Sequence, residues 1–318
     1  MKNYIYILSF IFICFSSCDK IEKPIPELPG AIDWNLYPGD SLDYLSYYNF
    51  NDPESNWNTN SNTKRNILLE YYTGHKCPNC PAAAVTGKDL ESNNSLGVTM
   101  ISIHAVPGNG FQYTFPPDFT TDFTTEAGDI YATEIPGLNA NPKGTINRIP
   151  NSNNPESEIW FSSDEWETNV NQEANQNLLA NIQVQTNYFP STNGLFIHTE
   201  SEIKSNLVGD YRLIIYLIRR SVIAPQEFPN GIIEYDYDHH NVLSDNINGA
   251  WGTPIGSNNL VEESKFYNDF SYEIPSLSTD STYGIENLSL VTYICKLDKV
   301  SDPKSFKIIQ VTKTDLEP

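Results

Sequence analysis

Two cysteines separated by two residues form the strongest chemical motif of the chain, Cys77-Pro78-Asn79-Cys80. With this spacing both sulfurs can meet across one helical turn, so the pair can cycle between a dithiol and a disulfide. Zinc binding by the pair would require two further ligands, and the sequence contains no second CxxC and no CxxH motif. We therefore expect either redox chemistry or a structural disulfide at Cys77 and Cys80, with no metal ion and no cofactor.

The residues on both sides of the motif predict a buried strand, a turn and then a helix. Residues 66–72 are mostly apolar and lack Pro and Gly, which is typical of a buried strand, and residues 82–85 favour a helix. At the start of that helix, Cys77 would lie near unpaired N–H groups and the positive end of the helix dipole, which favour the thiolate. His75 and Lys76 would add positive charge beside it.

In the redox interpretation, Cys77 is the exposed attacking thiolate and Cys80 is the buried resolving thiol, so that exchange proceeds through a mixed disulfide. Glu70, on the preceding strand, is a candidate proton relay for the resolving cysteine, although an ion pair with Arg or Lys is the plainer explanation for this residue. The alternative is a structural disulfide on a scaffold that was recruited for binding, because a fold does not determine a function.

The order of these elements resembles a thioredoxin-like domain. The further elements expected for it are strands at 97–106 and 158–161 and helices at 118–134 and 162–180. The resemblance implies a proline before the penultimate strand that faces the cysteines and aligns the extended backbone of a substrate. Pro142 fits this place, and Pro136 is the weaker candidate.

Beyond residue 180 the pattern changes to alternating strands separated by turn signals, which is typical of an immunoglobulin- or fibronectin-like β-sandwich. The predicted strands are 182–188, 194–203, 211–221, 266–274, 288–297 and 306–313. A long insertion between the third and fourth of these strands is interpreted as a solvated polar loop or a binding loop. The expected fold class is thus an α/β thioredoxin-like domain, a mixed sheet with flanking helices, followed by an all-β sandwich.

Three other groups of residues invite interpretation. His104 lies in an apolar strand and is interpreted as a hydrogen-bonded core histidine. Cys295 has no partner cysteine and is expected to be a buried free thiol. Phe111, Tyr113 and Phe115 could either form an aromatic lip over the cysteines or cover the sheet edge.

The amino terminus has the layout of a secretory signal, with Lys2 followed by an apolar run that is too short to span a membrane. Ser16-Ser17-Cys18 resembles the lipobox of bacterial lipoproteins, which implies lipidation of Cys18, although Phe15 departs from the usual aliphatic residue. Plain secretion is the alternative. The expected domains are 1–17 (signal peptide), 18–63 (lipidated cysteine and tether or packing segment), 64–180 (thioredoxin-like domain) and 181–318 (β-sandwich).

The charge balance excludes one class of partner. With 19 Lys and Arg against 40 Asp and Glu, the formal net charge is −21 and no basic patch is visible, so nucleic acid is not an expected partner. The acidic balance instead favours solubility beside a membrane surface.

Three motifs together with the signal resemble the Omp28-related outer-membrane lipoproteins of Bacteroidetes-type bacteria. They are the segment from Tyr72 to Pro81 that contains the cysteine pair, the Asn147-Arg148 pair, and the run from Asp238 to Leu243. The resemblance implies a cell-envelope protein held at the outer membrane by a lipid on Cys18. Its partners would be thiols or disulfides of exported proteins, or an unidentified ligand if both domains serve only as a binding scaffold.

Overall fold

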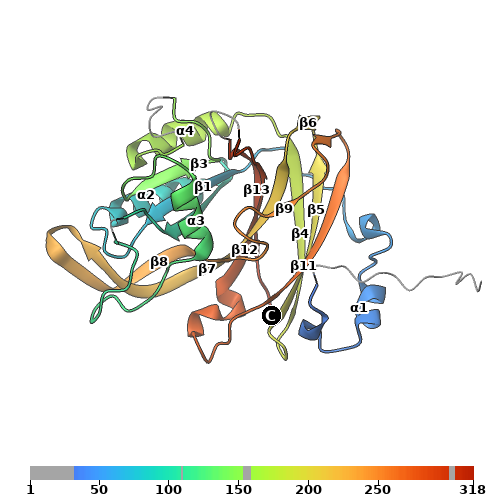
Figure 1. The fold of residues 1–318 in the computed structure, drawn as a ribbon, viewed down its shortest axis with the longest axis horizontal. Coiled ribbons are helices and arrows are strands. Elements are labelled where there is room, and N and C mark those ends of the chain that lie inside the picture. The colour runs from blue at the N-terminus through green and yellow to red at the C-terminus, as the bar shows by residue number, and fades with distance from the viewer. Residues whose placement is uncertain (1–31, 109, 153–158, 301–304) are drawn as a thin grey trace, which may run out of the picture.

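The computed structural model describes residues 32–108, 110–152, 159–300 and 305–318 (Figure 1). The predicted signal peptide and Cys18 lie outside these residues. No helix in the described part of the chain is both long enough and apolar enough to cross a membrane.

Most of the described secondary structure is β, and one large mixed sheet dominates it. The strands of this sheet follow the order β13-β12-β7-β8-β2-β1-β3, and β9 pairs with β7. The β1–β2 and β2–β8 pairs are parallel and the others are antiparallel. The strands are β1 (Ile67–Thr73), β2 (Val98–His104), β3 (Lys143–Ile146), β7 (Tyr211–Phe228), β8 (Ile232–Asn246), β9 (Thr253–Pro254), β12 (Leu288–Lys296) and β13 (Ile308–Asp315).

Helices cover both faces of the sheet around β1 and β2. Alternate residues of β1 point to opposite faces, so Leu69 and Tyr71 belong to one core with helices α2 (Cys80–Ser92) and α4 (Trp166–Glu173). Leu68 and Tyr72 belong to another core with helix α3 (Glu126–Glu134). Helix α2 approaches the sheet closely at Gly87, where a Cβ atom would lie 2.5 Å from the sulfur of Met100.

A second sheet packs against the carboxy-terminal part of the large one. It contains β11 (Lys265–Glu273), β5 (Gly194–Ile203) and β4 (Ala180–Phe189), and its apolar side chains share a core with β7, β12 and β13. Strands β6 (Leu207–Val208) and β10 (Asn259–Leu260) form a small separate pair. Helix α1 (Ser41–Tyr47) lies beside this second sheet, at the end of the molecule away from α2 (Figure 1).

The expected fold class, an α/β thioredoxin-like domain followed by a separate β-sandwich, is wrong. Strands from both sides of residue 180 belong to the same sheet, because β8 pairs with β2 at Ser102 and Val242. Without β8, that edge of β2 would expose unpaired backbone groups. The insertion expected to be a loop forms the end of β7, which continues from the predicted strand 211–221 to Phe228, and β8, which begins at Ile232. The domain boundaries at residues 63 and 180 stay predictions.

Several predicted elements differ in their bounds. Helix α3 begins at Glu126 rather than 118, because the Thr125 side chain accepts a hydrogen bond from the backbone N–H of Gly128 and caps it there. Of the strand predicted at 158–161, residue 158 lies outside the described residues, and Phe161 makes only an isolated bridge to Gly144. The capping box of Ser162 and Glu165 is present, but the helix that follows it ends at Glu173.

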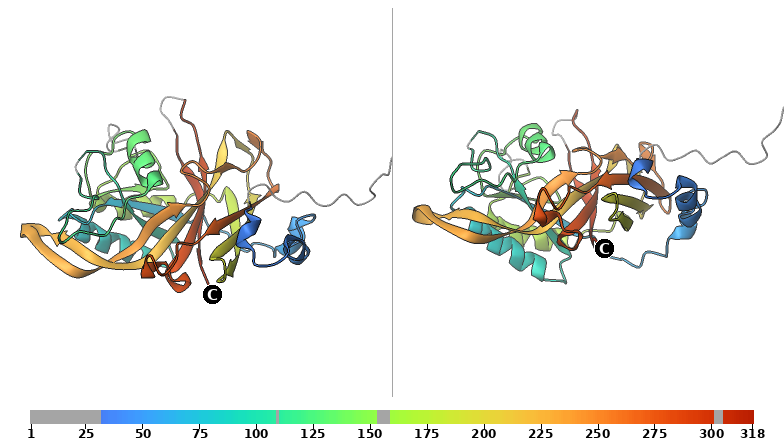
Figure 2. Two further views of the ribbon diagram at one scale, coloured as in Figure 1. Left: turned by 60° about the horizontal axis from the view of Figure 1, so that its bottom comes forward. Right: turned by 90° about the horizontal axis from the view of Figure 1, so that it is seen from below.

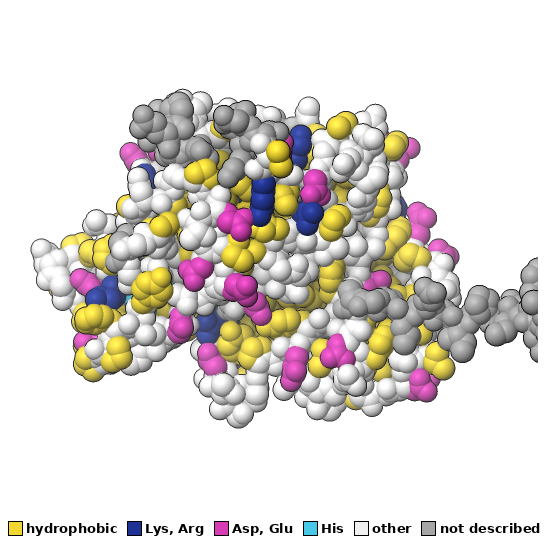
Figure 3. Space-filling model, in the orientation of Figure 1, with side chains coloured by type: hydrophobic (Ala, Val, Ile, Leu, Met, Phe, Trp, Pro, Cys, Tyr) yellow, Lys and Arg dark blue, Asp and Glu magenta, His cyan; other side chains and the backbone are white. Residues whose placement is uncertain are grey.

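Strands β7 and β8 form a long hairpin that leaves the body of the sheet. In both views of Figure 2 this hairpin projects beyond the rest of the molecule, and in Figure 1 it lies beside α2. On the face drawn in Figure 3, the Lys and Arg side chains form no continuous patch and the acidic side chains are scattered.

Candidate functional site

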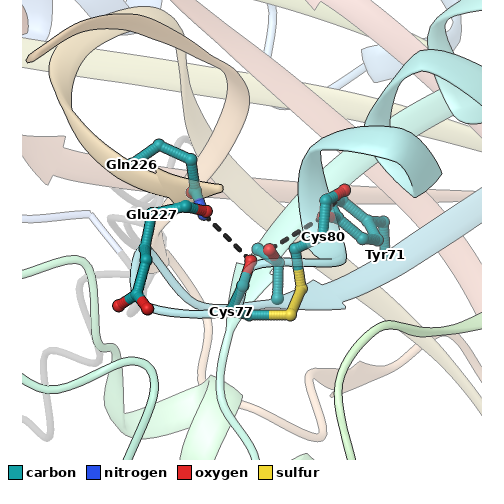
Figure 4. The surroundings of a disulfide bond; sticks show 6 residues. Tyr71, Cys77, Cys80, Gln226 and Glu227 are labelled. Atoms are coloured by element: carbon teal, nitrogen blue, oxygen red, sulfur yellow. Dashed lines mark hydrogen bonds between the residues drawn. A yellow bond between two sulfur atoms is a disulfide. The ribbon is translucent and has the colours of Figure 1, made fainter. Parts of the chain in front are cut away.

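The Cys77-Pro78-Asn79-Cys80 segment forms the turn between β1 and α2 (Figure 4). The Cys77 N–H donates to the Gly74 carbonyl oxygen at 2.9 Å and the Cys80 N–H donates to the Cys77 carbonyl oxygen at 3.1 Å. The two sulfurs are joined in a disulfide with an S–S distance of 2.11 Å. Helix α2 begins at Cys80, so Cys77 lies one turn before the helix rather than in its first position.

Two hydroxyl groups of β1 form hydrogen bonds that stabilise the start of α2 next to the turn. Tyr71 donates its hydroxyl hydrogen to the Cys80 carbonyl oxygen at 2.6 Å, and Thr73 donates to the Tyr71 hydroxyl oxygen at 2.9 Å. Burial raises the pKa of Tyr71 far above its ordinary value, more than the hydrogen bond from Thr73 lowers it. The phenol therefore stays a hydrogen-bond donor at every physiological pH.

The β7–β8 hairpin covers the same turn from the other side. The Gln226 side-chain amide donates to the Cys77 carbonyl oxygen at 3.1 Å, and the Glu227 backbone N–H donates to the His75 carbonyl oxygen at 2.8 Å (Figure 4). Cys77 and Cys80 are each only 1% exposed. The structure thus places Cys77 in the interior, whereas the redox interpretation expects an accessible sulfur.

The loop between β2 and α3 closes the site further. Phe111 packs against the core cluster that contains both cysteines, and its carbonyl oxygen accepts a hydrogen bond from the Lys76 N–H at 3.1 Å. Tyr113 and Phe115 are more than half exposed. Of the three aromatic residues considered as a lip, only Phe111 therefore belongs to the surroundings of the disulfide.

The two predicted sources of positive charge behave differently. His75 is buried against Phe119, and burial lowers its pKa more than the hydrogen bond to the Tyr113 carbonyl oxygen raises it. The imidazole is therefore uncharged at neutral pH. The Lys76 ammonium lies 3.6 Å from the centre of the Phe115 ring, which is 60% exposed, so this cation–π contact lies at the surface.

Glu70 lies on the opposite face of β1 from Tyr71 and does not reach the cysteines. Its carboxylate is fully buried and accepts two hydrogen bonds from Arg148, at 2.7 Å from Nε and 2.5 Å from Nη2. Thr145 and Tyr216 donate two more. Although burial lowers it, the pKa of Arg148 is held well above its ordinary value by the charge of Glu70. This arrangement is a buried ion pair of the core.

Pro142 lies at the edge of the sheet from which the cysteine turn emerges. The Asn141–Pro142 peptide bond is cis, and the next residue, Lys143, pairs with Tyr72. Pro142 is thus adjacent to the end of β1, which leads into the cysteine turn. Pro136 instead accepts a hydrogen bond at its carbonyl oxygen from the Trp160 side chain, near the end of α3.

Two buried histidines lie on the strands next to the cysteine turn. The rings of His104, on β2, and His239, on β8, pack against Phe123 at centroid distances of 4.4 and 4.6 Å. Neither ring nitrogen of His104 has a hydrogen-bond partner among the described residues, so His104 is a core histidine but not a hydrogen-bonded one. Both rings line a cavity of about 10 Å³ that Tyr71 and Gln226 also line, which is about the space of one water molecule.

These histidines are uncharged at neutral pH. Burial lowers the pKa of His104 well below its ordinary value, and nearby His239 and His75 add to the effect. Burial and then His75 lower the pKa of His239 to about 4. No three His, Cys, Asp or Glu side chains of the described residues are grouped so that they could hold a metal ion.

An open groove of about 390 Å³ runs alongside the cysteine turn. Helix α2 and the turn supply one wall and the hairpin supplies the other. Its lining residues are Pro78, Asn79, Pro81, Ala82, Ala84, Val85, Lys88, Phe228, Pro229 and Tyr237. The sequence alone did not predict Gln226, Phe228 and Tyr237 as site residues. The alternation of residues 222–240 could have indicated strands there, but this segment is interpreted from the sequence as a loop.

These features define a β-rich protein with a shielded disulfide. The family model of the outer membrane protein Omp28 matches residues 131–318, which is more than half of the sequence. The chain belongs to this outer-membrane protein family and is a protein of the cell envelope. No curated protein matches the chain.

Two solved structures are similar at low sequence identity. HBP35 of Porphyromonas gingivalis is 12% identical with a TM-score of 0.56, and the match covers 81% of this chain and 77% of HBP35. A protein of Agrobacterium tumefaciens is 12% identical with a TM-score of 0.47, covering 78% of this chain and 93% of that one. Because the similarity to HBP35 extends well across residue 180, the shared fold also contradicts the expected pair of separate folds.

Proposed function

We propose that this envelope protein carries out thiol–disulfide exchange on exported proteins through Cys77 and Cys80. The observation that carries the proposal is the disulfide-bonded CPNC turn between a buried strand and helix α2. A substrate thiolate attacks one sulfur to form a mixed disulfide and releases the other as a thiolate. A second substrate thiol then attacks the mixed disulfide, so that the substrate is oxidised by two electrons and the CPNC pair is reduced to a dithiol.

The surroundings of the turn support a stabilised thiolate at Cys77. Helix α2 has no acidic residue in its first turn, and the Asn79 side chain makes no capping hydrogen bond there. The positive end of the helix dipole therefore faces the turn without a carboxylate of the first turn to compensate it. The Lys76 ammonium adds charge of the same favourable sign.

A second candidate function is binding without catalysis, with an inert disulfide as a structural staple. The specific observation in its favour is the burial of both cysteines, which are 1% exposed beneath Gln226. With the cysteines buried in this way, thiol–disulfide exchange would require the β7–β8 hairpin to move away from the turn. A binding protein needs no such movement.

The reduction potential of the Cys77–Cys80 pair separates the two candidates. It is measured in the purified protein by equilibration with glutathione, followed by thiol alkylation and mass measurement, with Cys77→Ser as the control. A potential between roughly −120 and −270 mV, with rapid alkylation of Cys77 after reduction, supports exchange. A potential below about −300 mV is typical of structural disulfides and would leave the binding function.

We also propose that a lipid on Cys18 anchors the protein in the outer membrane, on the basis of Ser16-Ser17-Cys18 after the apolar signal. The Cys18→Ala variant should lose incorporation of labelled fatty acid. Recovery of label equal to that of the unchanged protein would contradict lipidation at this residue.

A further inference from the structure

The groove beside the cysteine turn is formed by two segments that lie far apart in the sequence. Pro78 and Asn79, which separate the two cysteines, belong to one wall together with the first turns of α2. Phe228, Pro229 and Tyr237 from the β7–β8 hairpin form the other wall. Any molecule that fills the groove therefore lies next to the turn that holds the disulfide, although neither cysteine lines the groove.

The lining of the groove is mostly apolar. Val85 is 59% exposed although it lies in the middle of α2, and the hairpin contributes two rings and a proline opposite it. Exposed apolar side chains that are gathered in a groove lower the free energy when an apolar ligand covers them. A volume of about 390 Å³ is in the range that holds a few side chains.

Lys88 is the one charged residue among those that line the groove. It makes no ion pair with any described residue, and it lies in a chain with a net charge of −21. The acidic residues of the hairpin, among them Glu227 and Asp238, do not line the groove. An unpaired ammonium beside an apolar surface is complementary to a ligand that carries a carboxylate next to an apolar side chain.

We infer that the groove binds an extended segment of an exported polypeptide in which an apolar side chain lies beside Val85 and a carboxylate pairs with Lys88. This inference rests on the proposed exchange function, because such a segment would hold a neighbouring cysteine beside the turn, from which it would reach the disulfide when the contact between Gln226 and Cys77 opens. A free fatty acid also has an apolar part and a carboxylate. A polypeptide is favoured because the turn between the two cysteines forms part of the groove wall, where a cysteine of the bound segment could react.

Two matched variants test the apolar contact. Val85→Asn changes the groove, and Val208→Asn changes a valine of β6 that is 69% exposed and does not line it. The probe is a short synthetic peptide in which Phe, Glu and Cys are neighbours, together with a form that has Ser in place of Cys. Binding of the Ser form, measured by fluorescence anisotropy, should weaken about tenfold in Val85→Asn and stay unchanged in Val208→Asn.

A charge exchange tests the contact with Lys88. Lys88→Glu should weaken binding of the Glu peptide and bind a peptide with Lys in place of Glu more tightly, whereas Lys64→Glu, an exposed control, should do neither. The exchange rate with the Cys peptide should fall in Val85→Asn and Lys88→Glu and should stay unchanged in the control variants Val208→Asn and Lys64→Glu.

The possible outcomes distinguish failure of the proposed peptide-binding groove from failure of the proposed exchange reaction. One outcome is that the unchanged protein binds the Ser peptide, Val85→Asn does not, and the Cys peptide shows no exchange with the unchanged protein. This result would support the groove and overturn the exchange function. Exchange of the Cys peptide that is equally fast in Val85→Asn and Val208→Asn would overturn the groove and leave exchange intact. Oleate that binds more tightly than the peptide, with the same dependence on Val85, would assign the groove to acyl chains and overturn the inference.

Discussion

Gln226 donates a side-chain hydrogen bond to the Cys77 carbonyl oxygen at 3.1 Å across a separation of 149 residues. The contact joins the β7–β8 hairpin to the cysteine turn, and the Gln226 side chain is nearly fully buried in making it. The backbone bond from Glu227 to His75 fixes the next residue of the hairpin in the same way. Access to the disulfide therefore depends on how often the hairpin leaves the turn.

Replacing Gln226 with Ala should make the disulfide easier to reduce. Loss of one net hydrogen bond, worth about 1 kcal/mol, would raise the population of the open hairpin about fivefold. The rate of reduction by a phosphine, followed by alkylation and mass measurement, should rise by about this factor. Gln176→Ala, at an exposed position, is the control and should show no change. An equal rate in both variants would mean that the hairpin does not limit access.

The local order of strand, cysteine turn and helix could be predicted because its signals are local. The apolar run at 66–72 corresponds to β1, and the alanine-rich segment after the turn lies in α2. Strand β5 has the predicted bounds Gly194–Ile203. In each case a short window contains the periodicity, the turn residues and the capping signals that decide the structure.

The shared sheet and the hairpin could not be predicted in this way. Residues 222–246 contain Pro225, Pro229 and several acidic residues, which favour a loop, yet they form the end of β7 and the whole of β8. These strands pair with each other along most of their length, and β8 also pairs with β2 at Val242. Only four of the fifteen residues of β8 are buried, so its alternation lacks the apolar contrast of a core strand. The walls of the groove and the cover over Cys77 therefore depend on contacts that no local window contains.

The buried pair of Glu70 and Arg148 should be important for stability. Arg148→Met removes the charge that compensates a fully buried carboxylate, and breaking such a pair costs about 3–5 kcal/mol. The free energy of unfolding, measured with urea, should fall by this amount. The control is Arg220→Met, whose exposed pair with Asp315 should contribute less than about 1 kcal/mol. Similar losses in both variants would contradict the role assigned to the buried pair.

Acidification should destabilise the protein through His104 and His239. The pKa of His239 falls from 6.5 to about 4 on folding, and that of His104 is also lowered, so the unfolded chain binds their protons first. Their contribution is fully present above about pH 6.5 and is lost as the pH falls toward the folded-state value. For His239 alone the loss reaches roughly 3 kcal/mol at pH 4. Urea unfolding at steps between pH 7 and pH 4 measures it.

His104→Phe should remove part of this acid sensitivity. The ring of Phe keeps the stacking on Phe123, and it replaces two ring nitrogens that have no partner among the described residues. Replacing an unsatisfied buried polar group with an apolar one of similar shape is neutral or stabilising. The variant should be at least as stable as the unchanged protein at pH 7 and should lose less stability by pH 4. An unchanged slope with pH would exclude His104 as a contributor.

The segment of residues 32–57 should be held on the second sheet by a buried Tyr–His–Asp chain. The Tyr44 hydroxyl lies 2.7 Å from His198 Nε2, and His198 Nδ1 lies 2.6 Å from the Asp269 carboxylate. Tyr44→Phe removes the hydroxyl and leaves His198 and Asn187 without that partner, at a cost of about 1–3 kcal/mol. Limited proteolysis should then cut residues 32–57 faster.

Tyr47→Phe is the matched control, because the Tyr47 ring belongs to the same helix but is 75% exposed. Neither substitution changes Tyr48, whose ring centre lies 3.7 Å from that of His198, so the stacking contact of the segment with the sheet should be retained in both variants. A difference in proteolysis between the two variants therefore reports the hydroxyl group alone. Equal rates would mean that aromatic packing, rather than the hydrogen-bonded chain, holds this segment in place.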